Sequence, residues 1–334
     1  MKDAKMGEEY MVNDLETADI KQFQFPVAMV WEITNKCHSN CIYCSGGFPE
    51  KQENAEMTYE EKHQFVQECI DNRLFAINIS GGEPFLSGDL LWVVDKLTQA
   101  KIHVMVVTSG LIHDDEKISS LMANPYVGLN VSLDSFNPET NDYHRGISHS
   151  VDRVKEFLRR ISVEQKYIAL ECVLTKKNYN DLENYIEKAS EFSISEVRFQ
   201  PAVAMSQKMI DLQLYLSDEE IQLAKAKVEE LAKKTRNMRI RFVDQSATIM
   251  GGFRNSRNWG GIVGPDGELT VNAYLPFEFG KISDYESFKD AWDKGFAHAW
   301  DYPQIYEAIS KIKSINDVVN LHKQCGYKIR HIVL

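Results

Sequence analysis

The sequence is poor in cysteine and lacks long apolar runs and an excess of basic residues. Only 6 of its 334 residues are cysteine, which argues against a disulfide scaffold and favours a reducing, cytoplasmic setting. No run of about 18 apolar residues is present, so no membrane span is expected. The net charge of −11 disfavours a nucleic-acid surface, which needs a basic patch. The acidic, polar start of the chain does not resemble a secretory signal.

From about residue 27 the chain alternates short β-rich runs with amphipathic segments of helical spacing. The runs predict strands at 27–34, 75–80, 102–108, 126–132, 167–175 and 196–200. The first helical segment opens with a capping box, Thr58 with Glu61. Repeated strand–helix–strand units require right-handed crossovers and a parallel sheet. Six units predict an α/β fold with a partial, TIM-like (β/α)6 barrel, because a complete eight-unit barrel needs about 250 residues.

The pattern changes near residues 205–216, where we place a domain boundary. A strongly periodic helix is predicted at 217–236, followed by a strand, RIRFVDQ, a glycine-bearing loop at 251–261 and a hairpin turning at 265–267. Further helices are predicted near 284–296, 303–312 and 314–323. The sequence therefore predicts a flexible N-terminal arm (1–26), a barrel (27–205) and a smaller α+β extension (206–334).

Three of the six cysteines fall within eight residues, in the stretch WEITNKCHSNCIYCSGG. Cys37, Cys41 and Cys44 have the spacing C-x3-C-x2-C after the first predicted strand. Thiolates at this spacing suit zinc or an iron–sulfur cluster. Structural zinc normally takes four protein ligands, and the adjacent His38 is awkwardly placed to be the fourth. Three thiolates on a four-iron cluster leave one iron open, and a small-molecule chelate can occupy it.

The triad, with Tyr43 before its last cysteine, resembles the signature of the radical S-adenosylmethionine (radical SAM) enzymes. The resemblance implies one [4Fe–4S] cluster, whose open iron is chelated by S-adenosylmethionine. It implies that the reduced cluster cleaves this molecule and that the 5′-deoxyadenosyl radical abstracts a substrate hydrogen. The cofactor then performs the difficult step, and the protein orients it and excludes water. A flavodoxin- or ferredoxin-like external electron donor is implied as a partner.

Further segments resemble the family in chain order. SGGEP (80–84), VVTSG (106–110), LNVSLDSFNPETNDYHRG (129–146) and RFQPA (198–202) follow predicted strand ends. The resemblance assigns contacts with the cofactor to Tyr43, Gly81, Gly82, Glu83, Thr108, Ser109, Ser132, Asp134, Arg145, Arg198 and Gln200. Alternative interpretations remain for single segments. SGGEP is compatible with an ordinary turn, and Ser132 and Asp134 with turn capping.

The C-terminal third resembles the SPASM or twitch extension of many members, without its ligands. Residues 258–292 follow that pattern, yet no cysteine occurs near 257–259 or 271–273. Cys69, Cys172 and Cys325 alone remain outside the triad. We therefore predict an extension without an auxiliary cluster. This disfavours oxidations that remove an electron from a substrate radical, and it favours redox-neutral reactions.

Three residues are candidates for catalysis on the substrate. An epimerase needs a hydrogen donor, often a thiol, and Cys172 and Cys325 are the candidates. The alternative for each is an inert, packed cysteine. Glu171 is a candidate base or a binding group for a substrate amine, and a salt bridge to a surface helix is its alternative.

Three functions remain open. The first is a radical SAM enzyme that modifies a ribosomally made peptide, as in natural product biosynthesis, by epimerisation, crosslinking or a related reaction. The short stretch before residue 27 argues against it, because many such enzymes carry a peptide-recognition domain there. The second is the same chemistry on an aminosugar, a nucleotide-sugar or an amino-acid derivative. The third is a non-catalytic iron–sulfur or zinc protein.

Overall fold

The computed structural model describes residues 23–48, 53–162, 166–255, 258–327 and 330–332. Most of the predicted N-terminal arm, residues 1–22, lies outside this part. The last residues of the arm are anchored. The Phe23 carbonyl accepts a hydrogen bond from Trp292 Nε1 at 2.9 Å, and the buried Phe25 ring meets Phe288 edge-on at 5.4 Å. The prediction of a loose arm up to residue 26 therefore extends too far.

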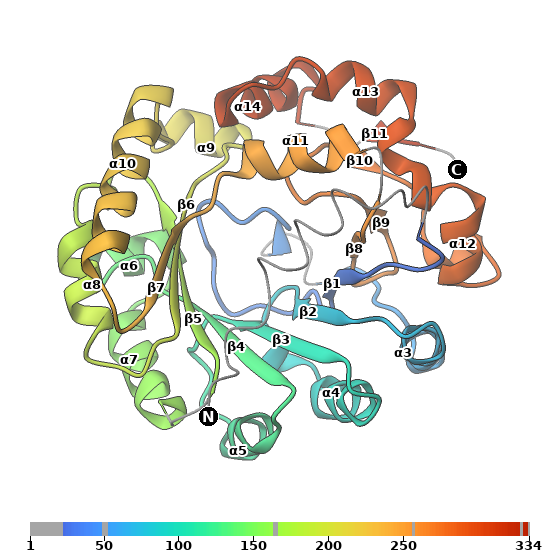
Figure 1. Ribbon diagram of the computed structural model, residues 1–334, viewed down its shortest axis with the longest axis horizontal. Helices are drawn as coiled ribbons and strands as arrows, with labels where there is room; N and C mark the ends of the chain where they lie inside the picture. The colour runs from blue at the N-terminus through green and yellow to red at the C-terminus, as the bar shows by residue number, and fades with distance from the viewer. Residues whose placement is uncertain (1–22, 49–52, 163–165, 256–257, 328–329, 333–334) are drawn as a thin grey trace.

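Strands and helices alternate along the first two thirds of the chain (Figure 1). The strands there are β1 (Ala28–Glu32), β2 (Ala76–Ser80), β3 (His103–Thr108), β4 (Val127–Ser132), β5 (Ile168–Leu174), β6 (Glu196–Pro201) and β7 (Arg239–Phe242). The helices are α3 (Tyr59–Asp71), α4 (Leu90–Gln99), α5 (Asp115–Ala123), α6 (Pro138–Arg145), α7 (Ser150–Ile161), α8 (Leu182–Ala189), α9 (Gln207–Leu212) and α10 (Asp218–Lys234). A short 3₁₀ turn, η1 (Pro84–Leu86), follows β2.

The last third contains short strands and helices. They are α11 (Gln245–Asn255), β8 (Ile262–Val263), β9 (Leu269–Thr270), β10 (Phe277–Glu278), η2 (Ile282–Asp284), α12 (Phe288–Lys294), η3 (Phe296–Asp301), α13 (Pro303–Ile309), α14 (Ile315–Gln324) and β11 (Arg330–His331). β8 and β9 form the predicted antiparallel hairpin around 265–267. Residues 251–255 of the predicted glycine-bearing loop instead belong to α11.

One nine-stranded sheet organises the described residues. Its order is β7-β6-β5-β4-β3-β2-β1-β8-β9, and every pair but β8–β9 is parallel. The sheet curves into an open barrel with α3, α4, α5, α7, α8 and α10 outside it and α11 across its open side (Figure 1). The predicted α/β fold with six strand–helix units is thus confirmed.

The predicted boundary at residue 205 does not interrupt the sheet. β7 pairs with β6, and β8 pairs with β1, so the extension supplies strands beyond both ends of the six-stranded part. The Val27 N–H also donates to the Trp259 carbonyl at 2.7 Å. The two regions therefore share one hydrogen-bonded ladder.

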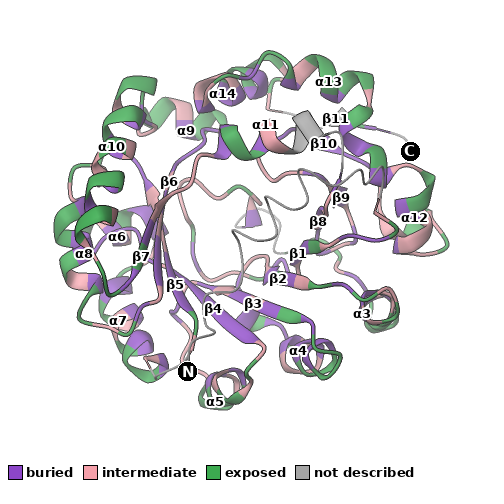
Figure 2. Ribbon diagram, in the orientation of Figure 1, coloured by how far each residue is buried: buried purple, intermediate pink, exposed green. Residues whose placement is uncertain are grey.

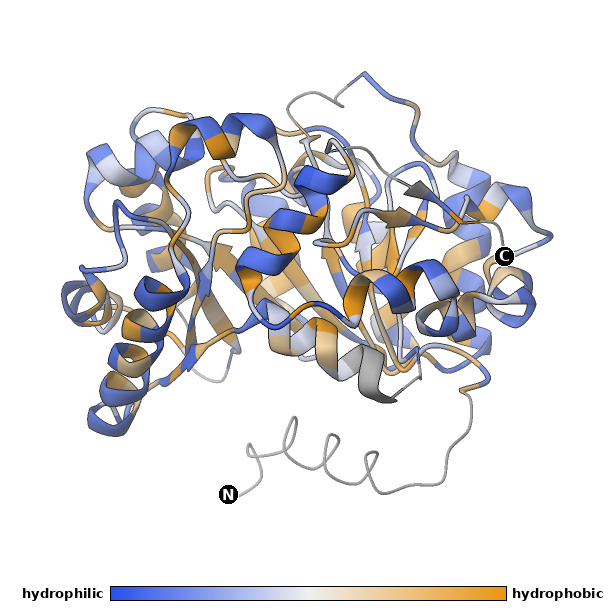
Figure 3. Cartoon of the chain, turned by 90° about the horizontal axis from the view of Figure 1, so that it is seen from above, coloured by the Kyte–Doolittle hydropathy of each residue, from blue (hydrophilic) through white to orange (hydrophobic). Residues whose placement is uncertain are grey.

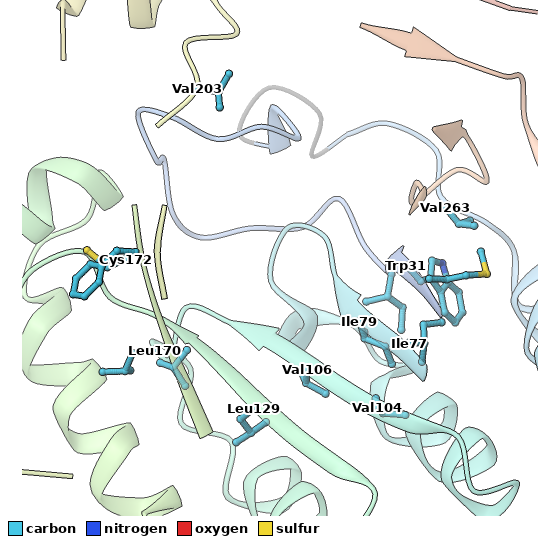
Figure 4. Close-up of a cluster of buried hydrophobic side chains, with 14 of the residues drawn as sticks. Trp31, Ile77, Ile79, Val104, Val106, Leu129, Leu170, Cys172, Val203 and Val263 are labelled. Atoms are coloured by element: carbon cyan, nitrogen blue, oxygen red, sulfur yellow. The ribbon is translucent and has the colours of Figure 1, made fainter. Parts of the chain in front are cut away.

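The two faces of the sheet differ in chemistry. On one face, alternate residues are fully buried against the helices. Trp31 meets Phe65 of α3, with ring centroids 5.1 Å apart, and Phe199 meets Tyr185 of α8 at 5.2 Å. Strand residues are largely buried, whereas the outer faces of the helices are exposed (Figure 2). Apolar residues are concentrated on the strands and on the helix faces that cover them (Figure 3). Figure 4 shows part of this buried cluster. The other face lines the barrel interior.

Helix ends follow the local sequence. Thr58 and Glu61 form the predicted capping box of α3, and Ser217 with Glu220 forms the same motif at α10. Each motif satisfies backbone N–H groups that the first helical turn leaves unpaired. No described helix is both long and apolar enough to cross a lipid bilayer.

Candidate functional site

The three clustered cysteines lie in a loop that leaves β1 and crosses the middle of the barrel (Figure 1). One side of this cysteine loop, residues 33–48, is fixed by the end of α6. The Asn40 N–H donates to the Arg145 carbonyl at 2.9 Å, and the Ile42 N–H donates to the His144 carbonyl at 3.0 Å. The loop is thereby bonded through its backbone to the segment that follows β4.

The other side of the cysteine loop is fixed by the SGGEP segment after β2. The Gly82 N–H donates to the Thr34 carbonyl and the Glu83 N–H to the Lys36 carbonyl, both at 2.8 Å. A Cβ on Gly82 would lie 2.3 Å from the Lys36 oxygen. Glycine is required here because two backbone segments touch.

Gly146 has the matching role beside α6. It adopts φ +62° as the left-handed cap of that helix. A Cβ on it would lie 2.4 Å from the Asn40 oxygen. The cysteine loop thus lies between two glycines, and the sequence indicated only the first of these positions.

Asp134 joins the cysteine loop to the barrel through its carboxylate. Arg145 Nε lies 2.9 Å from Asp134 Oδ2, and the Val173 N–H donates to Oδ1 at 2.9 Å. The Tyr43 hydroxyl donates to the same carboxylate, and Arg145 Nη1 lies 3.8 Å from Cys41 Sγ. Asp134 is 1% exposed, so its carboxylate serves these protein groups. Its contact with the cofactor stays a prediction, and the structure shows Asp134 bonded to Tyr43 and Arg145.

Glu83 connects two segments that the sequence assigned to one site. Its carboxylate accepts from the Thr108 hydroxyl at 2.8 Å and from the Ser109 N–H at 2.8 Å. The Ser109 hydroxyl donates to it as well and lies 3.5 Å from His38 Nε2. Glu83 is 1% exposed. The structure therefore brings together the ends of β2 and β3 and the start of the cysteine loop.

The cysteine loop has a donor set that fits an iron–sulfur cluster. Burial, together with the neighbouring Cys41 and Cys44, raises the pKa of the Cys37 thiol to about 11. Binding iron would favour the thiolate forms. The buried His38 Nδ1 and Ser39 Oγ have no hydrogen-bond partner within the described residues.

In the part of the chain that the structure describes, no three His, Cys, Asp or Glu side chains are grouped to hold one metal ion. The alternative of a zinc site in this loop stays open.

The inner face of the barrel carries a row of polar residues. Register pairs Ser132 with Glu171 and Glu171 with Arg198 across β4, β5 and β6. The Asn130 amide donates to the Glu171 carboxylate. Glu171 is half-buried, so a ligand in the barrel can reach it.

Cys172 lies on the opposite face from Glu171. It pairs in register with Phe199 and is 1% exposed among the residues under α8, as Figure 4 shows for its place in the buried cluster. Its Sγ donates to the Asp134 carbonyl at 3.3 Å. The prediction that Cys172 donates hydrogen to a substrate radical is therefore corrected, because alternation along β5 turns it away from the barrel interior.

Arg198 and Gln200 are engaged by protein groups. Arg198 Nε lies 3.2 Å from Glu196 Oε1, and its Nη2 donates to the Tyr167 hydroxyl at 3.0 Å. Gln200 Oε1 accepts from Gln245 Nε2 of α11 at 2.5 Å. Arg198 is thus directed toward the amino end of the sheet, away from the loops after β1 and β2. Its predicted contact with the cofactor is not supported by this placement.

The remaining cysteines do not join the triad. Cys69 is buried in α3, and Cys325 lies at the C-terminal cap of α14. A cleft of about 420 Å³ lies between α9 and α14, with Lys176, Tyr215 and Lys323 among its lining residues. None of the predicted site residues lines it.

Sequence reasoning assigned no role to Asn130, His144 and Gly146, although all three lie within the 129–146 segment. His144 Nε2 lies 2.9 Å from Thr175 Oγ1, which ties α6 to the end of β5. The His-Arg-Gly run at 144–146 offered a signal, because glycine directly after a helix is typical of a left-handed cap.

Comparison with known proteins identifies the region that holds this site. Residues 31–189 match the family described as the Radical SAM superfamily. The AdoMet-dependent heme synthase of Methanosarcina barkeri is 26% identical over 166 residues, covering 50% of this chain and 48% of that protein. The mycofactocin maturase MftC of Mycolicibacterium smegmatis is 29% identical over 170 residues, covering 50% and 42%. The chain spans about half the length of the curated relatives it matches.

The fold is similar to that of a solved protein over most of the chain. SuiB of Streptococcus suis, in a crystal structure with precursor peptide SuiA, aligns with a TM-score of 0.66 and 14% sequence identity. The alignment covers 87% of this chain and 68% of SuiB. At this identity the likeness concerns the fold.

Proposed function

We propose that the chain is a radical SAM enzyme acting on a ribosomally made peptide, because residues 31–189 match the Radical SAM superfamily. Cys37, Cys41 and Cys44 would hold a single [4Fe–4S] cluster. When bound, the cluster and S-adenosylmethionine supply a 5′-deoxyadenosyl radical that abstracts a substrate hydrogen. The observation that carries the proposal is the thiol-bearing loop, which is fixed by the backbone on both sides at the mouth of the barrel.

The chain's own residues position this chemistry. The Asp134–Arg145 pair and Tyr43 hold the middle of the cysteine loop against α6. Glu83, Thr108 and Ser109 form one bonded unit beside its first residues. Preformed hydrogen bonds and ion pairs such as these keep a cofactor site from reorganising during the reaction. Gly81 and Gly82 leave room for the loop, and Ser132 and Glu171 face the interior, where the substrate would lie.

We further propose that the reaction is redox-neutral. Within the described residues, the cysteines outside the triad lie apart, in α3, in β5 and at the end of α14. The predicted lack of auxiliary-cluster cysteines in the extension supports a reaction that does not remove an electron from a substrate radical. A flavodoxin- or ferredoxin-like protein of the cytoplasm would supply the electron for each cleavage.

A peptide substrate is the first choice, and a small molecule is the second. One matched relative is a maturase, and the solved protein of similar fold binds a precursor peptide. Another relative is a heme synthase, which favours the small-molecule alternative. Deuterium transfer from a labelled substrate into 5′-deoxyadenosine separates the two.

Reconstitution of the cluster tests the enzymatic activity. The anaerobically reconstituted and reduced chain should bind iron and sulfide and form 5′-deoxyadenosine from S-adenosylmethionine. Replacement of all three loop cysteines by alanine should abolish both. Cys325→Ala is the matched control and should retain both. Full iron binding in the triple variant, or no 5′-deoxyadenosine from protein that holds the cluster and binds S-adenosylmethionine, would contradict the proposal.

A further inference from the structure

We propose that Asn130 and Glu171 on the inner face of the barrel bind a nitrogen group of the substrate, an amine or an amide with at least two N–H hydrogens. The inference rests on the proposed function, because it specifies the chemistry of the substrate in the same barrel. It follows from four observations on strands β4, β5 and β6 and on the segment after β9.

The orientation of the Asn130 amide is fixed. Its Nδ2 donates to Glu171 Oε2, and an ionised carboxylate only accepts hydrogen bonds. The amide oxygen must therefore point elsewhere. Asn130 is 4% exposed, and its Oδ1 has no partner in the part of the chain that the structure describes. A buried acceptor without a donor is costly, so a bound group that supplies a donor would be stabilised here.

Glu171 offers a second acceptor beside the first. It lies on the inner face, between Ser132 and Arg198 in register. It is half-buried, unlike Asn130, so its carboxylate remains accessible from the interior. One group with two hydrogens can satisfy the Asn130 oxygen and the carboxylate together, whereas a hydroxyl donates only one hydrogen.

The nearby arginines are directed to another carboxylate. Arg198 Nε lies 3.2 Å from Glu196 Oε1, and Arg241 Nη1 lies 3.5 Å from the same oxygen. Glu196 is two residues before Arg198 on β6, toward the amino end of the sheet. The Tyr167 hydroxyl fixes the guanidinium of Arg198 at this level. The charge of Arg198 still interacts with the Glu171 carboxylate, but the hydrogen bonds of its guanidinium go to Glu196 and Tyr167.

Tyr274 comes from the C-terminal part of the chain. Burial raises the pKa of its phenol, and the Glu171 carboxylate raises it further. The Tyr274 carbonyl lies 2.9 Å from His322 Nε2 of α14, and this contact fixes the segment after β9. The phenol stays neutral at pH 7, so it adds no negative charge beside Glu171.

The Asn130 oxygen and the Glu171 carboxylate together disfavour two kinds of substrate group. A substrate carboxylate would be repelled by Glu171, and a hydrocarbon would leave the Asn130 oxygen unpaired. Sites built to bind an N–H or O–H group reject analogues that lack it by about 10⁴-fold in favourable cases. The inner face thus selects a lysine-, arginine-, glutamine- or asparagine-like group, or a free amino terminus.

Binding of three blocked pentapeptides tests the inference. They are identical apart from lysine, glutamine or norleucine at the central position, and norleucine keeps the length of the side chain without its nitrogen. We expect the reconstituted chain with S-adenosylmethionine to bind the lysine and glutamine peptides at least tenfold more tightly than the norleucine peptide in calorimetry. Equal affinity for all three, including none measurable, overturns the proposal.

Substitutions test whether Asn130 and Glu171 cause the preference for peptides with a nitrogen group. Asn130→Leu should reduce the preference for both nitrogen groups to less than threefold, and Glu171→Gln should reduce that for lysine most. Asn78→Leu replaces an exposed asparagine on β2 and is the matched control that should retain the preference. If circular dichroism shows that Asn130→Leu does not fold, Glu171→Gln decides. A preference that survives in every folded variant contradicts the assignment.

Formation of 5′-deoxyadenosine in the same samples reports on the proposed function separately. Its presence without any peptide preference would contradict only the substrate inference. A peptide preference without 5′-deoxyadenosine would contradict only the radical chemistry.

Discussion

Gly82 and Gly146 hold the cysteine loop at a separation that no other residue allows. We expect Gly82→Ala to destabilise the fold by about 1–3 kcal/mol, the usual cost of overpacking, because the added methyl meets the Lys36 carbonyl at 2.3 Å. Reconstituted protein should also retain less iron. Thermal unfolding and iron content measure the two effects.

Gly88→Ala is the control for this substitution. No heavy atom lies within 4 Å of a Cβ at Gly88, so the variant should unfold within about 0.5 kcal/mol of the unchanged chain, as most surface substitutions do. The steric explanation is wrong if Gly82→Ala matches Gly88→Ala in both stability and iron content.

The sequence was enough to identify which residues belong to the site, but less so to predict which group each of them contacts. The sequence indicated Cys37, Cys41 and Cys44 from their spacing alone, since no other stretch concentrates thiols. It assigned Asp134 to the cofactor, whereas the structure buries this carboxylate beside Arg145 and Tyr43. Which partner a side chain meets depends on tertiary distances that a linear pattern does not contain.

At the scale of elements, periodicity predicted the long segments well. The six strands of the barrel were predicted within a few residues because each is a short β-rich run between helical segments. The end of α11, residues 251–255, was predicted to be a loop because Gly251 and Gly252 lower helix propensity. Packing against α13 and α14 favours the helix there, which illustrates how tertiary contacts override a local preference.

The docking of α14 should depend on pH through His322. Burial lowers the pKa of His322, which is 5% exposed, so the unfolded chain binds a proton more readily than the folded one. The stability that the neutral ring contributes is fully present above about pH 6.5, the ordinary histidine value. It is lost as the pH falls from there toward the folded pKa.

Urea unfolding at pH 7.5 and pH 5.5 measures this dependence. His322→Gln keeps an N–H donor near the Tyr274 carbonyl but does not titrate, so its free energy of unfolding should fall less between the two pH values. His63→Gln, at an exposed position on α3, is the control and should behave as the unchanged chain. An identical pH dependence in all three proteins would rule out His322 as a source.

At the scale of the whole molecule, we expect the predicted barrel and extension to unfold in one step, because they share one hydrogen-bonded sheet. β7 and β8 continue the ladder on either side of β1–β6, so neither region can lose its structure without exposing a strand edge of the other. We expect far-ultraviolet circular dichroism and near-ultraviolet signals to give one coincident transition in urea. Two separated transitions would show that residue 205 is an independent boundary after all.

The architecture was predictable because each strand–helix unit is local in sequence. The pairing of β1 with β8 was not, because β8 has two residues and its partner lies more than 200 positions earlier in the sequence. The polar inner face was also hidden, since Asn130 and Glu171 come from different strands and their side chains meet only in the folded chain.

The β1–β8 pairing has a consequence for how the protein is made. β1 leaves the ribosome early in synthesis. The N–H groups of Val27 and Val30 donate to the carbonyls of Trp259 and Gly261, and these acceptors are synthesised more than 200 residues later. Until those residues emerge, one edge of the growing sheet stays open to other nascent chains. The cysteine loop follows β1 directly, so a cluster inserted before synthesis ends would enter a barrel whose first strand still has a free edge.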